Sequence, residues 1–193
     1  MLPKFQLAEA IQYDHVDDLK EALSRGANVN ECIDGQSMLQ LAEKHNANRC
    51  VPLLVKNGAD VLIRDSRGDG LLHRAARRGN YGFVVTLLEH GPPNLAQYVN
   101  ERNIQGQTAL HLAAKTGQVY LASLFIGKGA NVNLRDRHGR SPRDLAESSQ
   151  LQSMVDLLKL YGAAPNPNTP LFSYAERLEQ EESQPRRMFG IGR

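Results

Sequence analysis

Glycine recurs in this sequence at intervals that constrain the fold more than any other feature. Four glycines each have a second glycine 23 residues further along, in the pairs Gly35 and Gly58, Gly68 and Gly91, Gly106 and Gly129, and Gly139 and Gly162. The first members of these pairs follow one another at intervals of 33, 38 and 33 residues. A fixed period of roughly 20–50 residues indicates a chain of stacked structural repeats.

The most regular unit, Gly106–Asn133, contains two short apolar stretches. They cover residues 109–115 and 119–127, and Thr116 and Gly117 separate them. Helices of about eight residues are marginal in water, because nucleation is costly and one or two turns cannot repay it. Each helix pair must therefore bury its apolar face against copies of itself, which predicts an all-α solenoid of helix-turn-helix units.

Residues at fixed places in each unit resemble those of the ankyrin repeat family. Thr108–Ala114 reads TALHLAA, which is similar to the family's Thr-Pro-Leu-His opening with Ala109 in place of proline. Gly129–Asn133 reads GANVN, and Gly26–Asn30 and Gly58–Val61 repeat that ending. The resemblance covers about residues 5–164. It implies an ankyrin-repeat solenoid of stacked helix-turn-helix units with hairpin-like finger loops.

The period divides the chain into a repeat domain, residues 1–164, and a tail. We expect repeats at about 5–33, 34–66, 67–104, 105–137 and 138–164, with the first and last as caps. Residues 165–193 begin with three prolines within six residues and are expected to form a linker and a flexible C-terminal tail. The tail contains an apolar cluster, Phe172, Tyr174 and Leu178. As alternatives to a flexible tail, this cluster docks on the last repeat or serves as a linear motif.

Composition limits the compartment more than the function. No run approaches the roughly 18 apolar residues of a membrane span, and the start lacks the layout of a signal peptide. Two cysteines, Cys32 and Cys50, indicate free thiols in a reducing compartment rather than a disulfide framework. We expect a cytoplasmic or nuclear monomer without membrane contact, although a secreted bacterial effector would read the same way.

The histidines favour structural roles over catalysis. His73 and His111 occupy the same place in two repeats, whereas a catalytic site needs different residues that converge at one place. The resemblance implies that both hydrogen-bond to neighbouring turns. No zinc-type pairing, phosphate-binding glycine loop or nucleophile motif occurs. We therefore expect no enzymatic activity, no cofactor and no metal.

Basic residues concentrate where the resemblance places the partner, in the concave groove formed by finger tips and first helices. Counting from the opening glycines assigns nine basic residues to this groove: Lys44, His45, Arg67, Arg74, Arg77, Arg78, Lys115, Arg137 and Arg140. The five extra residues after Gly91 are expected to lengthen the third finger loop and to add four partner contacts: Pro92, Pro93, Leu95 and Tyr98. The alternatives are a solvated basic face and a tolerated insertion.

The leading hypothesis is an adaptor that binds a protein with an acidic surface or peptide through this basic groove and the long loop. On this hypothesis, glutamate at Arg74, Arg77 and Arg78 abolishes binding without disturbing the helices. Nucleic-acid binding along the same strip is the alternative, and it is weaker because no aromatic residues interleave with the basic ones to stack on bases. Tyr81 and Phe83 are expected to pack between repeats. A further alternative is an inhibitor or effector that masks a host enzyme or transcription factor.

Overall fold

The structure is a computed structural model that describes residues 3–165. Its helices are α1 (Pro3–Gln12), α2 (Val16–Ser24), α3 (Met38–His45), α4 (Val51–Lys56), α5 (Leu71–Arg78), α6 (Tyr81–His90), α7 (Leu95–Val99), α8 (Ala109–Thr116), α9 (Val119–Gly127), α10 (Pro142–Ser148) and α11 (Gln152–Leu160). Two short strands, β1 (Cys32–Ile33) and β2 (Gln36–Ser37), pair antiparallel. The predictions for the tail, including Phe172, Tyr174 and Leu178, lie outside the described residues.

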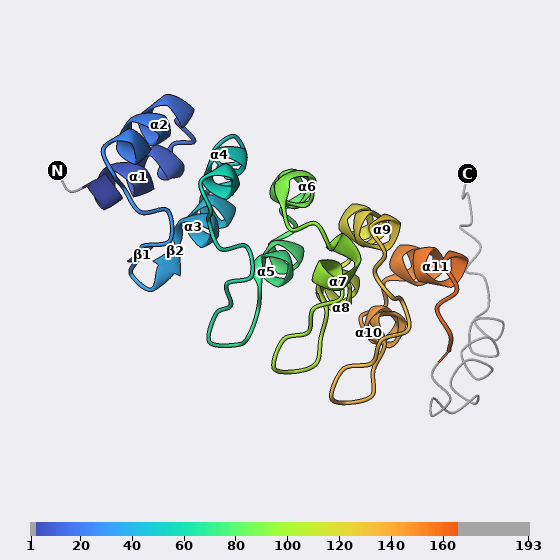
Figure 1. Ribbon diagram of the computed structural model, residues 1–193. Coiled ribbons are helices and arrows are strands. Elements are labelled where there is room, and N and C mark those ends of the chain that lie inside the picture. Colours follow the sequence, from blue (N-terminus) through green and yellow to red (C-terminus); the bar gives the residue numbers. More distant parts are fainter. Residues whose placement is uncertain (1–2, 166–193) are drawn as a thin grey trace, which may run out of the picture.

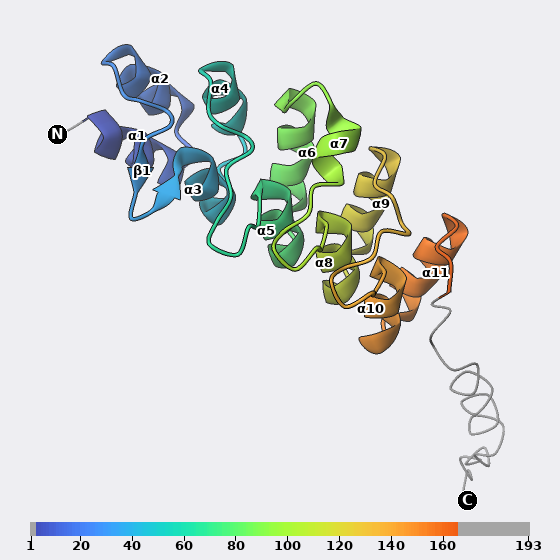
Figure 2. The ribbon, with the colours of Figure 1, turned by 60° about the horizontal axis from the view of Figure 1, so that its bottom comes forward.

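The helices form two layers of a solenoid, as predicted (Figure 1). An inner layer contains α1, α3, α5, α8 and α10, and an outer layer contains α2, α4, α6, α9 and α11. Both views show the chain advancing one helix pair at a time, with the long loops between pairs projecting beside the inner layer (Figures 1 and 2). We call these loops fingers, and the one that leads into α3 contains the β1–β2 hairpin.

The turns between inner and outer helices share one backbone conformation. Gly79 and Gly117 end α5 and α8 with positive φ, and Asn46 takes the same left-handed conformation after α3, which asparagine tolerates better than most residues. Gln150 also has a φ of 58° in repeat five. Glutamine has no special tolerance for this region, so the packing of the flanking helices must hold it there.

The apolar core is continuous along the stack. In repeat three the inner helix buries Leu71, Leu72, Ala75 and Ala76, and the outer helix buries Phe83 completely. Because each inner helix contacts the inner helices before and after it, no repeat has a core of its own.

The five extra residues after Gly91 do not lengthen a finger, which corrects the prediction made from the sequence. They form α7, and Val99 and Asn100 then resume the place that Val132 and Asn133 take one repeat later. The Tyr98 ring is buried, and its hydroxyl donates to the Val61 carbonyl at 3.0 Å. The insertion is therefore an additional packing element.

Two buried histidines join successive repeats. His73 Nδ1 accepts the Gly70 N–H at 3.3 Å, and its Nε2 donates to the Gln107 carbonyl at 2.9 Å. His111 likewise accepts the Thr108 N–H at 3.1 Å and donates to the Arg140 carbonyl at 3.2 Å. These bonds assign the neutral tautomer that carries its proton on Nε2. Each ring links the start of its own inner helix to the next finger, the structural role predicted for it.

Burial of His111 makes stability depend on pH. Desolvation outweighs the carbonyl bond and lowers the His111 pKa to about 4, and it lowers the His73 pKa as well. In the unfolded chain histidine binds a proton below about pH 6.5. Between pH 6.5 and 4 the unfolded state therefore binds more protons than the folded state. As the pH falls through this range, His111 alone lowers the free energy of unfolding by about 1.4 kcal/mol per pH unit.

Replacement of His111 by glutamine tests whether this histidine makes the stability depend on pH. Gln40 occupies the same place in repeat two, where its side-chain oxygen accepts the Ser37 N–H at 3.0 Å, so glutamine can keep the bond at the helix start. Urea denaturation at pH 7, 6 and 5 should show a shallower pH dependence for H111Q than for the wild type. Equal slopes in the two proteins would contradict the assignment.

Candidate partner-binding surface

The nine predicted basic residues lie at two places in the solenoid. Six lie on inner helices, namely Lys44 and His45 on α3, Arg74, Arg77 and Arg78 on α5, and Lys115 on α8, whereas Arg67, Arg137 and Arg140 lie in fingers. All are exposed except Arg74, whose side chain is 15% exposed. We call these nine residues the basic face. Five of them form ion pairs with carboxylates of the same chain, which the count of basic residues could not reveal.

Glu43 is the first of these carboxylates. Its side chain is fully buried between α3 and α5, with Oε2 3.3 Å from Arg74 Nε and Oε1 3.2 Å from Arg78 Nε. Oε1 makes no hydrogen bond, so this buried group is only partly satisfied. Desolvation raises the Glu43 pKa above its ordinary value even though both arginines oppose the shift.

Comparison of the repeats shows what is unusual about this pair. The place of Glu43 in its helix is taken by Ala76 in α5 and Ala114 in α8, and the place of Arg74 is taken by Leu112 in α8. Ala76 and Leu112 are buried. Repeats two and three therefore meet through an ionic contact at positions where repeats three and four carry two buried apolar residues.

Asp69 holds a second group of arginines. Its buried carboxylate is 2.5 Å from Arg77 Nη2 and 3.6 Å from Arg67 Nε, and it accepts a 2.7 Å bond from Asn103 Nδ2. The partly exposed Asp65 lies 3.6 Å from Arg67 and 4.0 Å from Arg74. The four arginines that repeat three contributes to the basic face are thus fixed by three carboxylates, two of which are fully buried.

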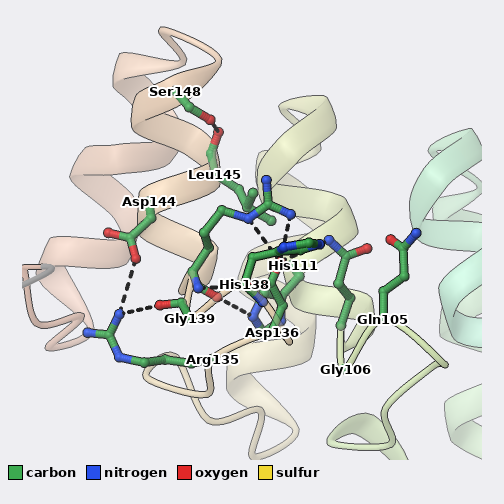
Figure 3. A network of polar contacts seen from close by, with 12 residues as sticks. Gln105, Gly106, His111, Arg135, Asp136, His138, Gly139, Asp144, Leu145 and Ser148 are labelled. Carbon is green, nitrogen blue, oxygen red and sulfur yellow. Dashed lines mark hydrogen bonds and ion pairs between the residues drawn. The ribbon is translucent and has the colours of Figure 1, made fainter. Parts of the chain in front are cut away.

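Asp136 repeats this arrangement one finger later. Its Oδ2 accepts bonds from Arg140 Nε and Nη2 at 3.0 and 2.8 Å, and its Oδ1 accepts the backbone N–H groups of His138 and Arg140 (Figure 3). Desolvation would raise the Asp136 pKa, but these bonds outweigh it and lower the pKa to about 2. Asp136 therefore stays ionised, and it orients the Arg140 guanidinium.

Sequence reasoning missed a second set of arginines. Arg64, Arg102 and Arg135 each donate to the carbonyl of the glycine four residues later, in their own finger. Arg64 and Arg102 also donate to a backbone carbonyl of the following finger, and Arg135 reaches Asp144 at 3.4 Å (Figure 3). The detectable signal was an arginine four residues before three of the finger glycines, Gly68, Gly106 and Gly139. These arginines brace the fingers.

Four members of the basic face remain without an ion-pair partner among residues 3–165, namely Lys44, His45, Lys115 and Arg137. They flank the arginines of repeat three on both sides along the chain. Pro92, Pro93, Leu95 and Tyr98 do not join them, because α7 lies against the outer layer, where Ala96 approaches Gly129 after α9. The predicted loop contacts are therefore separate from the basic face.

The described residues offer little to other kinds of site. Between residues 3 and 165, no three His, Cys, Asp or Glu side chains gather in a way that could hold a metal ion. None of the eleven helices has the length and apolar character that a bilayer crossing needs. A surface hollow of about 480 Å³ lies between α1 and α2, and another of about 470 Å³ lies beside α4. Neither is lined by the basic face.

Comparison with known proteins gives a consistent result. A family model described as ankyrin repeats (3 copies) matches residues 7–98 and 72–170. Diacylglycerol kinase zeta of Rattus norvegicus is 33% identical over 129 residues, which cover 67% of this chain and 12% of the kinase. The nuclear factor NF-kappa-B p105 subunit of Gallus gallus is 34% identical over 66% of this chain and 14% of its own length. The B-cell lymphoma 3 protein homolog of Mus musculus is 32% identical over 74% of this chain and 32% of its own length. The chain thus spans about a third or less of these relatives.

The ionic contact between repeats two and three can be replaced by the apolar contact found one repeat later. The double variant E43A/R74L introduces alanine and leucine, the residues that Ala76 and Leu112 supply at the equivalent positions one repeat later. Exchange of a buried ion pair for packed apolar side chains often stabilises a protein by about 1–4 kcal/mol. R74L alone leaves the buried Glu43 with Arg78 only and should be destabilising. Urea denaturation at pH 7 measures the free energy of unfolding of both variants. A double variant that is less stable than R74L would contradict the prediction.

Proposed function

This chain belongs to the ankyrin repeat family, and we propose on that basis that it is a non-enzymatic adaptor that binds a partner protein through the basic face. Ankyrin repeats generally mediate protein–protein interaction. The observation that carries the proposal is the arginine group of repeat three, whose guanidinium groups are held by buried carboxylates while Arg67, Arg77 and Arg78 stay exposed. An inhibitor that masks an enzyme or transcription factor would use the same face.

Fixed guanidinium groups suit an acidic partner. An arginine held on one side by Asp69 or Glu43 has already lost much of its side-chain freedom, so less entropy is lost when a partner carboxylate binds its free N–H groups. The planar donor fork then favours two parallel hydrogen bonds to that carboxylate. Preorganisation thus supports specificity for carboxylates at Arg67, Arg77 and Arg78.

Internal pairing also limits what these arginines contribute. Their positive charge is largely balanced within the molecule, so the long-range attraction of an acidic partner must come mainly from Lys44, Lys115 and Arg137. Exposed charges of this kind raise the association rate more than the affinity, and salt weakens their effect. The proposed surface therefore combines free cations, which attract the partner, with fixed arginines, which orient it.

Glutamate at Arg74, Arg77 and Arg78 is a poor test, because it would leave Glu43 and Asp69 buried beside like charges. We therefore expect this variant to lose helical content, unlike the expectation from the sequence alone. The removal of one partner of a buried pair costs about 3–5 kcal/mol, so lost binding would reflect lost folding.

Lys44 and Lys115 give a sharper test, because both are exposed at the ends of inner helices. We expect K44E/K115E to retain the circular dichroism and thermal unfolding of the wild type and to lose capture of the partner from a cell extract. The matched control K56E/K128E makes the same change of charge at the ends of outer helices and should capture normally. Equal capture by both variants would remove the basic face from the proposal.

One observation favours nucleic acid as the second candidate partner. Phe83 is buried as expected, but Tyr81 is 47% exposed and Tyr120 is 83% exposed, which corrects the expectation that Tyr81 packs between repeats. Exposed rings near basic residues can stack on the bases of a single strand. Titration of labelled single-stranded RNA at low salt should then show binding that Y120A weakens and that added salt abolishes. Absence of binding at low salt would leave the protein-binding proposal alone.

A further inference from the structure

An exposed apolar side chain lies at the tip of one finger. We define the tip as the two residues before each finger glycine, namely Ile33 and Asp34, Ser66 and Arg67, Ile104 and Gln105, and Arg137 and His138. Ile104 is 52% exposed, whereas Ile33 lies in strand β1 and is partly covered. Single exposed apolar residues are common, so exposure alone assigns no role to Ile104. Its neighbours in the adjacent fingers decide what it can bind.

Ile104 lies against the preceding finger. Its backbone N–H donates to the Arg67 carbonyl at 3.3 Å, and a Cβ atom placed on Gly68 would lie 3.0 Å from Ile104 Cγ2. The isoleucine side chain therefore rests on the bare backbone of a glycine. Because its main chain and one methyl group are held in this way, Ile104 presents the rest of its apolar surface in a fixed position.

The following finger repeats this contact with a cation. The Arg137 N–H donates to the Gln105 carbonyl at 2.9 Å, and a Cβ atom placed on Gly106 would lie 3.3 Å from Arg137 Cγ. Arg137 thus lies on Gly106 as Ile104 lies on Gly68. Each tip is therefore fixed to the finger before it, and the apolar tip is followed directly by a basic one.

Arg67, Ile104 and Arg137 come from three successive fingers, which lie in a row beside the inner layer (Figure 1). We call these three residues the tip row. The Arg67 side chain is 59% exposed and only loosely paired, at 3.6 Å from both Asp65 and Asp69. Arg137 has no ion-pair partner within residues 3–165. The tip row therefore offers an apolar centre between two positive charges that a ligand can reach.

We propose that the tip row binds an extended segment of the partner in which one apolar side chain lies between two acidic ones. This inference rests on the proposed function and adds what the partner must carry besides negative charge. The apolar side chain packs on Ile104, and the two carboxylates bind Arg67 and Arg137. An apolar contact surrounded by polar ones excludes water from its centre, which is the arrangement of an interface hot spot.

The stacking of the repeats sets the spacing within this segment. Adjacent fingers connect to adjacent inner helices, which pack about 8–10 Å apart. An extended chain advances about 3.3 Å per residue, so about three residues of the segment cover the distance from one finger to the next. We therefore expect the acidic residues about three positions before and about three positions after the apolar residue.

Selection from random peptides displayed on phage tests this spacing without knowledge of the natural partner. The immobilised full chain should enrich peptides with an apolar residue and an acidic residue about three positions away on each side. The variant I104S should enrich acidic peptides without the central apolar residue. Serine suits this position, because Ser66 occupies it in the preceding finger. The matched control L62S removes a side chain that is 51% exposed but lies outside the tip row, and it should select the wild-type motif.

Fluorescence anisotropy with one enriched peptide separates the two kinds of contact. We expect I104S to weaken binding about tenfold at every salt concentration, because it removes an apolar contact. R137Q should weaken binding at low salt and reduce its salt dependence, because it removes an exposed charge. Alanine in place of the peptide's apolar residue should weaken binding to the wild type and have little further effect on I104S, because the same contact is already lost.

The possible outcomes separate this inference from the proposed function. Enriched peptides that are acidic but carry no apolar residue at a fixed position would overturn the inference and leave the acidic partner in place. Selection of the wild-type motif by I104S, or fully additive effects of I104S and the peptide alanine, would do the same. Peptides without acidic residues, or no enrichment at all, would contradict both the inference and the acidic partner.

Discussion

Every helix of this solenoid depends on a neighbour, because none is long enough to be stable alone. Inner helices of seven to ten residues bury their apolar faces only when the next repeat is in place. The junction between repeats is therefore the unit of stability. The chain reinforces its junctions with His73 and His111, with Tyr98 from the inserted helix, and with the arginines that join one finger to the next.

The sequence was most informative about features that repeat. Glycine spacing set the register, and the register placed the two histidines correctly. It failed where a residue's environment is decided by a partner far away in the chain. Arg74 reads as an exposed cation until Glu43, 31 residues earlier, is seen beneath it. Tyr98 reads as a loop residue because the position of an insertion within a repeat cannot be inferred from its length alone.

Charge on the basic face illustrates the same difficulty in electrostatic terms. A count of lysines and arginines treats each charge as unpaired. Most of the arginines, however, form ion pairs with the buried carboxylates of Glu43, Asp69 and Asp136. Burial makes these carboxylates costly to leave unpaired, so the arginines are committed to the fold before they can serve a partner. Lys44, Lys115 and Arg137 carry the charge that a partner would meet first. Binding and stability therefore rest on different basic residues.

One helix position links these observations. Six residues after the helix cap, alanine in repeats three and four permits close apolar contact with the next inner helix, whereas glutamate in repeat two requires an arginine from it. Glutamate recurs there in repeat five, where the described chain supplies only Arg143 from the same helix. A buried glutamate is tolerated in repeat two because two arginines meet it. Glu147 does not need an arginine from a following helix, because its side chain is 37% exposed and Arg143 of the same helix pairs with it.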